Sequence, residues 1–162
     1  MSAVFNFTFV PWFRSVAPYI HMHRGKTFVI AVAGEALMAG KLAHLAQDMA
    51  LIQSLGVKIV LVHGFRPQVN EQLRLKGQSS RYSHGIRITD EIALDCVQEA
   101  AGQLRYEIEA AFSLGLPNTP MAGATVRVIS GNFLTARPVG IVDGVDFQHS
   151  GDRKSTRLNS SH

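Results

Sequence analysis

Two short apolar runs, each followed by a glycine-containing loop and then a helical pattern, constrain the fold of this chain most strongly. The runs are residues 26–32 and 57–62. Between them, apolar residues recur every three or four positions across residues 40–55, which is typical of an amphipathic helix. A second helix is predicted from Pro67 to about Lys76. This order predicts an α/β fold with a mainly parallel sheet and helices on both faces.

The rest of the chain predicts one long helix and several short elements. Residues 78–84 are expected to form a loop or a hairpin arm, and residues 85–88 a short strand. Thr89 or Asp90 can cap a long helix, whose apolar stripe is Ile92, Cys96, Ala100, Leu104, Ile108 and Phe112. Two further strands are expected at 125–129 and 133–136, and Asp143-Gly144 predicts a turn. Residues 12–20 predict a short N-terminal helix that Pro18 would kink or end.

Charge and composition narrow the function classes. The net charge is +4, but three basic residues and one acidic residue lie within 152–162, which leaves +2 for residues 1–151. So small a charge does not indicate a nucleic-acid partner. No segment approaches the roughly 20 consecutive apolar residues that a membrane-spanning helix needs. A single cysteine, Cys96, excludes an intrachain disulfide, and we expect a cytoplasmic protein.

The last eleven residues, 152–162, have a second explanation besides a disordered terminus. They back-translate codon by codon to a widely used sequencing-adapter sequence, so we predict that this segment is an artefact and exclude it from the fold. The natural reading frame is then expected to continue past Gly151. The resulting expectation is an N-terminal arm and helix over 1–25, the first part of a domain over 26–151, and a disordered tail.

The loops that follow the two strands are the candidate ligand-binding features. They are Ala33-Gly34-Glu35 and the loop of residues 63–67, His-Gly-Phe-Arg-Pro. In parallel α/β sheets, ligands bind at the carboxyl ends of the strands. Glycine lets the backbone approach a ligand, and Arg66 could hold a carboxylate with two hydrogen bonds. Turn glycines and a surface arginine explain the same residues equally well.

Several motifs resemble one family, the bacterial N-acetylglutamate synthases, in the order in which they occur there. They are Tyr-Ile-His-Met-His-Arg-Gly-Lys-Thr-Phe-Val-Ile at 19–30, His-Gly-Phe-Arg-Pro-Gln-Val at 63–69, Gly-Ile-Arg-Ile-Thr-Asp at 85–90, Ser-Gly-Asn-Phe-Leu-Thr-Ala-Arg-Pro at 130–138 and Asp-Gly-Val-Asp-Phe-Gln-His-Ser-Gly at 143–151. The resemblance implies an amino-acid-kinase-like domain that is incomplete at its C-terminus and lacks the acetyltransferase domain. It implies that the full enzyme transfers acetyl from acetyl-CoA to L-glutamate in the first step of arginine biosynthesis. L-Arginine is then the inhibitor, and a homo-oligomer is expected.

Acetylglutamate kinase, which shares this fold, is the first alternative. The kinases carry a lysine shortly before a Gly-Gly pair, and the matching position here is Ala31, with Ala33-Gly34 as the pair. Phosphoryl transfer needs cationic stabilisation that alanine cannot supply. Phe65 and Arg66 replace the glycines of the kinases' second loop and would crowd the phosphate. A non-catalytic amino-acid-sensing module is the second alternative.

The resemblance also suggests a vestigial amino-acid pocket, and no catalytic residue is assigned. Arg87 matches the arginine that holds the acetylglutamate carboxylate in the kinases, and Asn132 matches an asparagine near the ligand. With the strand-end residues, the predicted pocket is Gly34, Gly64, Arg66, Arg87 and Asn132. Equally, Arg87 could form an internal ion pair with Asp90 or Glu91. We expect no cofactor bound by this chain and no metal, because His21 and His23 lack a third ligand.

Overall fold

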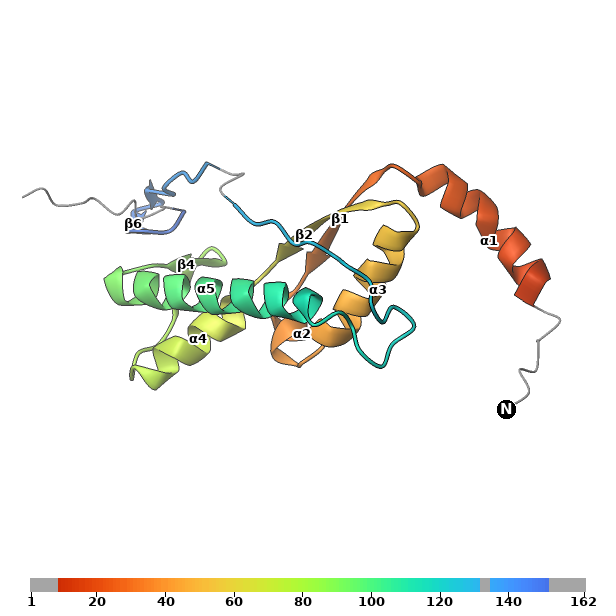
Figure 1. Cartoon of the computed structure of the whole chain (residues 1–162). Coiled ribbons are helices and arrows are strands. Elements are labelled where there is room, and N and C mark those ends of the chain that lie inside the picture. Colours follow the sequence, from red (N-terminus) through yellow and green to blue (C-terminus); the bar gives the residue numbers. More distant parts are fainter. Residues whose placement is uncertain (1–8, 132–134, 152–162) are drawn as a thin grey trace, which may run out of the picture.

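The computed structural model describes residues 9–131 and 135–151 (Figure 1). In chain order its elements are α1 (Phe9–His23), β1 (Thr27–Val32), α2 (Gly34–Met38), α3 (Leu42–Ser54), β2 (Lys58–His63), α4 (Arg66–Leu75), β3 (Arg81–Ser83), β4 (Ile86–Ile88), α5 (Glu91–Ser113), β5 (Ile141–Val142) and β6 (Val145–Asp146). The predicted artefact, residues 152–162, and the predicted site residue Asn132 lie outside these ranges.

The parallel pair of β1 and β2 is the centre of the fold, as the sequence predicts. The register runs from Thr27 opposite Lys58 to Val32 opposite His63. The connection between the two strands passes through α2 and α3, and α4 follows directly after β2. The α/β class with a parallel sheet is therefore confirmed, and both strand ends point to the same edge of the sheet.

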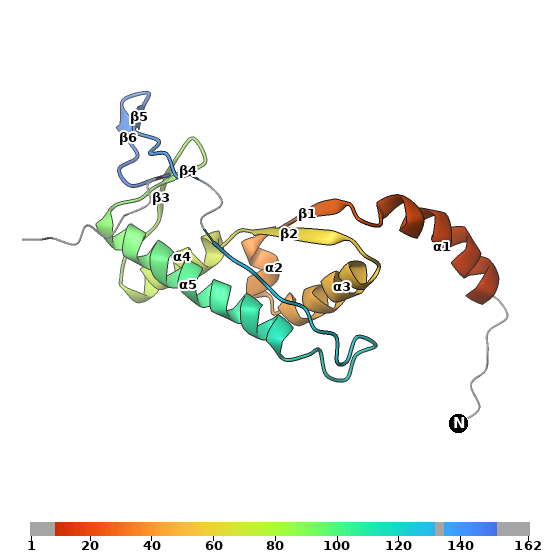
Figure 2. The ribbon, with the colours of Figure 1, turned by 45° about the horizontal axis from the view of Figure 1, so that its top comes forward.

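The main core lies between one face of the strand pair and helices α2, α3 and α5 (Figure 2). Side chains alternate across each strand, so Ile30, Val32, Ile59 and Leu61 face this core. Its buried members are Leu37, Ala46, Met49, Ala50, Leu104, Ile108, Phe112 and Leu116. Burying apolar surface is the main stabilising contribution here. A second cluster joins α4 to the start of α5 and contains Cys96, a core residue as predicted.

The opposite face of the strand pair is open in the part of the chain that the structure describes. Val29 is 69% exposed, Val60 48% and Val62 52%. Within those residues, the helices that pack on the sheet lie on one face of it. The described chain therefore carries an uncovered apolar sheet face.

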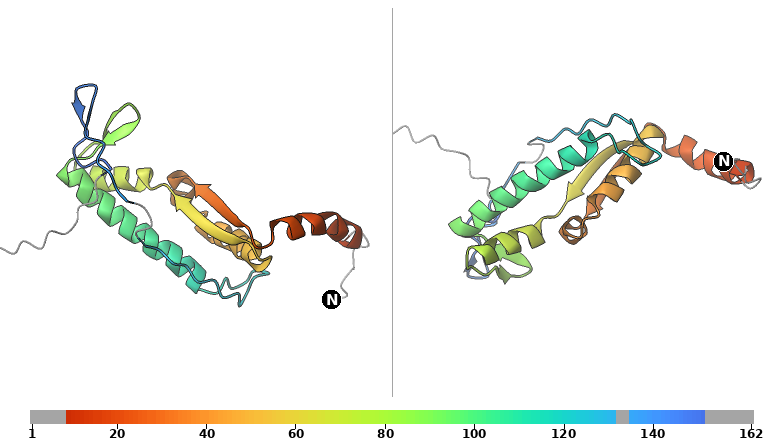
Figure 3. Two further views of the ribbon diagram at one scale, coloured as in Figure 1. Left: turned by 90° about the horizontal axis from the view of Figure 1, so that it is seen from above. Right: turned by 60° about the horizontal axis from the view of Figure 1, so that its bottom comes forward.

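The N-terminal helix is longer than the sequence predicts. It continues past Pro18 to His23. A proline removes one intrahelical hydrogen bond, to the carbonyl group four residues earlier, and that residue, Arg14, is exposed. His21 and His23 consequently lie in the last turn of this helix. None of the side chains of α1 is buried, and the helix extends away from the strand pair in both views of Figure 3.

The stripe predicted for α5 is correct from Cys96 onward and wrong at its first residue. Ile92 is 47% exposed, whereas Ala93, three residues before Cys96, is buried. Each four-residue step advances by about 40° around a helix, so a strict four-residue stripe drifts off the buried face. Asp90 is the N-cap, and its carboxylate accepts a 2.9 Å hydrogen bond from the backbone N–H of Ala93, as predicted.

The strand predicted at 125–129 is not formed, and neither Thr135 nor Ala136, the described part of the second predicted strand, is in a strand. Val126 and Val128 do alternate inward and pack against the main core. A cavity of about 680 Å³, however, lies between this segment and β2. A strand needs a hydrogen-bonded neighbour, and no described strand pairs with this segment. The Asp143-Gly144 turn is confirmed: both residues have positive φ and join β5 to β6.

Candidate functional site

The two strand-end glycines of the predicted pocket are in direct contact. A Cβ on Gly34 would lie 2.9 Å from the carbonyl oxygen of Gly64 and 2.9 Å from Cδ of Pro67. Gln68, on the first turn of α4, adds a hydrogen bond of 3.1 Å from its Nε2 to the carbonyl oxygen of Gly34. The loops after β1 and β2 are thus held together, and glycine is required at position 34.

Helix α4 begins beside this contact with its positive end unneutralised. Its N-cap, Phe65, provides no side-chain hydrogen bond, and its first turn contains no acidic residue. Backbone N–H groups at a helix start attract anions. Arg66 is the first residue of α4, so its backbone lies at the positive end of the helix while its side chain extends to the β3–β4 hairpin.

Arg66 and Arg87 meet at the ring of Tyr82. The guanidinium carbons lie 5.4 Å and 5.0 Å from the ring centre, respectively. Tyr82 and Arg87 are directly opposite each other in the β3–β4 hairpin, which explains why they are neighbours. Arg66 reaches the hairpin from α4 and donates to the carbonyl oxygen of Gly85 at 3.2 Å.

Within the described part of the chain, Arg87 donates its hydrogen bonds to neutral groups. It donates to Oδ1 of Asn70 at 2.7 Å, to the hydroxyl of Ser80, and to the carbonyl oxygen of Arg66 at 3.4 Å. Burial lowers the pKa of Arg87, Tyr82 opposes that shift, and repulsion from Arg66 lowers the pKa further. Two like charges are therefore held close together in a partly desolvated position.

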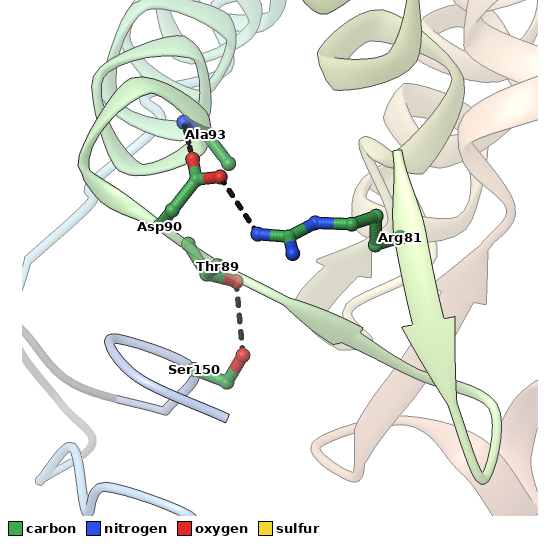
Figure 4. A network of polar contacts seen from close by, with 5 residues as sticks. All are labelled: Arg81, Thr89, Asp90, Ala93 and Ser150. Carbon is green, nitrogen blue, oxygen red and sulfur yellow. Dashed lines mark hydrogen bonds and ion pairs between the residues drawn. The ribbon is translucent and has the colours of Figure 1, made fainter. Parts of the chain in front are cut away.

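The alternative in which Arg87 forms an internal ion pair with Asp90 or Glu91 is wrong. Asp90 pairs instead with Arg81, at 3.1 Å, while it caps α5 (Figure 4). Within residues 9–131 and 135–151, no ion pair includes Arg66 or Arg87. An uncompensated arginine pair next to a helix N-terminus can bind a carboxylate.

Four of the five predicted pocket residues thus form one connected set: Gly34 contacts Gly64, Arg66 follows two residues later, and Arg87 donates to the backbone of Arg66. Asn132 lies outside the described residues.

Sequence reasoning missed Asn70, Ser80 and Tyr82, which position Arg87. For Asn70 a signal existed, because it lies four residues after Arg66 and therefore on the same face of α4.

The residue that bears most on the kinase alternative is Ala31, which stands where the kinases carry a lysine. It lies on the open face of β1 opposite Val62. Among the described residues, no three His, Cys, Asp or Glu side chains are grouped as a metal site would require. None of the described helices combines the length and the apolar character needed to cross a membrane.

Comparison with known proteins gives close relatives along most of the chain. The chain is 60% identical over 143 residues to the amino-acid acetyltransferase of Ralstonia nicotianae, which covers 88% of this chain and 32% of the relative. The same-named protein of Photobacterium profundum is 51% identical over 142 residues, covering 88% and 32%. The chain thus spans about a third of the length of these relatives.

The chain is also similar to solved structures. N-acetylglutamate synthase from Neisseria gonorrhoeae, complexed with coenzyme A and L-arginine, matches with a TM-score of 0.77 and 40% identity, over 87% of this chain and 33% of that one. Another structure of that enzyme, complexed with coenzyme A and N-acetyl-glutamate, matches this chain with a TM-score of 0.72. The model of the amino acid kinase family matches residues 26–161, which includes most of the segment predicted to be an artefact. The chain therefore belongs to the amino acid kinase family.

Proposed function

We propose that this chain is the first part of the kinase-like domain of an N-acetylglutamate synthase. In that enzyme a separate acetyltransferase domain transfers acetyl from acetyl-CoA to the α-amine of L-glutamate, the first step of arginine biosynthesis. The part present here serves regulation and oligomerisation and contains no catalytic residue. The observation that carries the proposal is the 60% identity to an amino-acid acetyltransferase over 88% of the chain.

Domain exchange tests the proposal. In the chimera, residues 9–151 of this chain replace the matching segment of the Ralstonia nicotianae relative. We expect the chimera to release coenzyme A from acetyl-CoA when L-glutamate is added, and we expect the 162-residue chain alone to release none. A folded chimera without activity, beside an active unexchanged relative, would contradict the proposal. So would acetyltransfer by the chain alone.

Phosphoryl transfer by acetylglutamate kinase is the competing function, and the strand-end geometry disfavours it. Ala31 offers no charge at the position where the kinases carry a lysine. Arg66 points to the β3–β4 hairpin. We expect no release of ADP from ATP in the presence of N-acetyl-L-glutamate.

We propose further that Gly34, Gly64, Arg66 and Arg87 form a pocket for the carboxylate of an amino-acid ligand, with Asn132 as an additional contact. The uncompensated charges of the two arginines support this sensing role. Calorimetry with N-acetyl-L-glutamate and with L-arginine tests it. Arg87→Gln is expected to abolish the heat of binding. Arg81→Gln is the control, because Arg81 is already paired with Asp90, and we expect its heat of binding to be unchanged.

We also propose that the full protein is a homo-oligomer located in the cytoplasm. Helix α1 presents Phe9, Trp12 and Phe13 with their rings close together and exposed, and such an apolar face is suited to a neighbouring subunit. No nucleic-acid or membrane partner is proposed. Light scattering of the active chimera is expected to show an oligomer that Trp12→Ser weakens; a monomeric active chimera would contradict this part.

A further inference from the structure

Asn70 is the centre of the hydrogen-bond network that fixes Arg87. Its Oδ1 accepts three hydrogen bonds: from Ser80 Oγ at 2.6 Å, from Tyr82 Oη at 3.0 Å and from Arg87 Nη2 at 2.7 Å. Ser80 accepts a further hydrogen bond from Arg87. One neutral oxygen on α4 thereby joins the helix to the segment that leads into the hairpin and to both hairpin strands.

A carboxylate in the place of this amide would bind the guanidinium of Arg87 more strongly. Aspartate has the same shape as asparagine, and a charged acceptor makes stronger hydrogen bonds to a guanidinium. An aspartate here would also offset the repulsion between Arg66 and Arg87 that contributes to the lowered pKa of Arg87. If only the stability of the fold mattered, aspartate would therefore be a better residue than asparagine at position 70.

The two arginines beside Asn70 have no carboxylate partner among the described residues. The first turn of α4 contains no acidic residue, and no ion pair among residues 9–131 and 135–151 includes Arg66 or Arg87. By contrast, Arg74 on the same helix and Arg81 on the same hairpin have carboxylate partners at 2.7 Å and 3.1 Å. Arg66 and Arg87 therefore differ from the arginines nearest to them in the sequence of these two elements.

We propose that Asn70 is a positioning residue that sets the charge selectivity of the carboxylate pocket, because its neutral oxygen orients Arg87 without cancelling the charge that attracts the ligand. This inference rests on the carboxylate pocket proposed above. It assigns a role to a residue that does not itself need to contact the ligand. It also states that the neutrality of residue 70, and not only its ability to accept hydrogen bonds, is what the pocket requires.

The test is Asn70→Asp in the 162-residue chain, with N-acetyl-L-glutamate as the probe. The variant keeps the acceptor, so we expect its thermal midpoint by circular dichroism to be unchanged or higher. Affinity for the probe, measured by calorimetry, is expected to fall on the order of tenfold or more, because the new carboxylate beside Arg87 repels the carboxylate of the probe. A purely structural role would make binding follow stability, whereas this proposal makes them move in opposite directions.

Gln72→Glu is the matched control. It adds the same charge to α4, but two residues along the helix lie about 200° around it, and Gln72 faces a groove shared with α2 and α5. We expect its affinity to stay within about twofold of the unchanged chain, since residue 72 faces away from Arg87 and salt screens its charge. Ser80→Asp, a second variant on a different element, places a carboxylate against Arg87 and is expected to weaken binding as Asn70→Asp does.

The outcomes separate the two proposals. If the unchanged chain binds no N-acetyl-L-glutamate, the carboxylate pocket is overturned and this inference with it. If the unchanged chain binds the probe and both Asn70→Asp and Ser80→Asp bind it equally well, the pocket stands and the role of Asn70 is overturned. Equal losses in Asn70→Asp and Gln72→Glu would also overturn it, because they would show a general effect of charge.

Discussion

Gly34 lies against the carbonyl group of Gly64, so that a Cβ on Gly34 would be only 2.9 Å from that oxygen. The contact joins the loops that follow the two parallel strands, and it is also where α4 begins. The relative position of the two loops depends on the missing side chain.

Gly34→Ala is therefore expected to destabilise the fold. The added methyl group meets backbone at Gly64 and the ring of Pro67, neither of which can move without shifting a strand end. We expect a loss of about 1–3 kcal/mol in the free energy of unfolding, measured by urea denaturation followed by circular dichroism.

Gly102→Ala is the matched control for that substitution. Gly102 lies inside α5 and has no atom within 4 Å of its ideal Cβ position. Alanine is expected to stabilise the helix there by about 0.5–1 kcal/mol. Equal effects of the two substitutions would contradict the close approach at Gly34.

A buried pair of hydroxyls connects the C-terminal segment to the end of β4. Ser150 Oγ donates its single hydrogen to the carbonyl oxygen of Arg87, so Thr89 Oγ1 donates to Ser150 Oγ, at 2.9 Å (Figure 4). Both residues are 6% exposed. Ser150→Ala is thus expected to leave two groups unsatisfied, the hydroxyl hydrogen of Thr89 and the carbonyl oxygen of Arg87. Thr89→Val leaves only one lone pair of Ser150 Oγ without a donor. We expect Ser150→Ala to cost about 1 kcal/mol more in unfolding free energy; the reverse order would refute this hydrogen-bond direction.

Glu109 provides a pH-dependent link between α5 and the segment before residue 132. Hydrogen bonds from Arg105, at 2.9 Å, and from Ser130, also at 2.9 Å, lower the pKa of Glu109. The ionised form therefore stabilises the native state above the ordinary glutamate pKa of about 4.3, and this contribution disappears as the pH falls through the lowered native value. We expect Glu109→Gln to be less stable than the unchanged chain near neutral pH and equal to it in acid.

Thermal midpoints measured across that pH range check the prediction. Glu107→Gln is the control, because it removes the same charge from the same helix but loses only a contact with the neutral amide of Gln103. A pH-independent difference between Glu109→Gln and the unchanged chain would contradict the role given to the carboxylate.

The open face of the strand pair is expected to make the isolated chain associate. Val29→Thr combined with Val62→Thr keeps β-branched side chains but makes that face more polar. We expect weaker binding of a hydrophobic dye and less self-association in gel filtration, with little change in stability. Leu61→Thr, which faces the core instead, is expected to cost about 2 kcal/mol. If all three positions behaved alike, the assignment of the two faces would be wrong.

Part of the candidate site was predictable from local sequence. Gly34, Gly64 and Arg66 follow predicted strands, and the carboxyl ends of parallel strands meet at one edge. Arg87 required the family resemblance. Of its actual partners, Asn70 had only an indirect signal, its place on the same face of α4 as Arg66. Ser80 had none, because it lies 7 residues before Arg87 and meets it only through the hairpin.

The sequence by itself determined the features that neighbouring residues encode. These are the two apolar strands and their helices, the cap at Asp90, the turn at Asp143-Gly144 and the burial of Cys96. Each depends on side-chain periodicity or on backbone preferences within a few residues.

Only the tertiary structure decided which distant groups pair. The β-rich segment 125–129 forms no strand, because a ladder needs a partner edge and a cavity separates it from β2. Arg81, and not Arg87, pairs with Asp90, which leaves Arg66 and Arg87 with neutral partners around Tyr82. Local sequence cannot specify such pairings, because the energy of a polar contact depends on how the whole chain brings its two groups together and shields them from water.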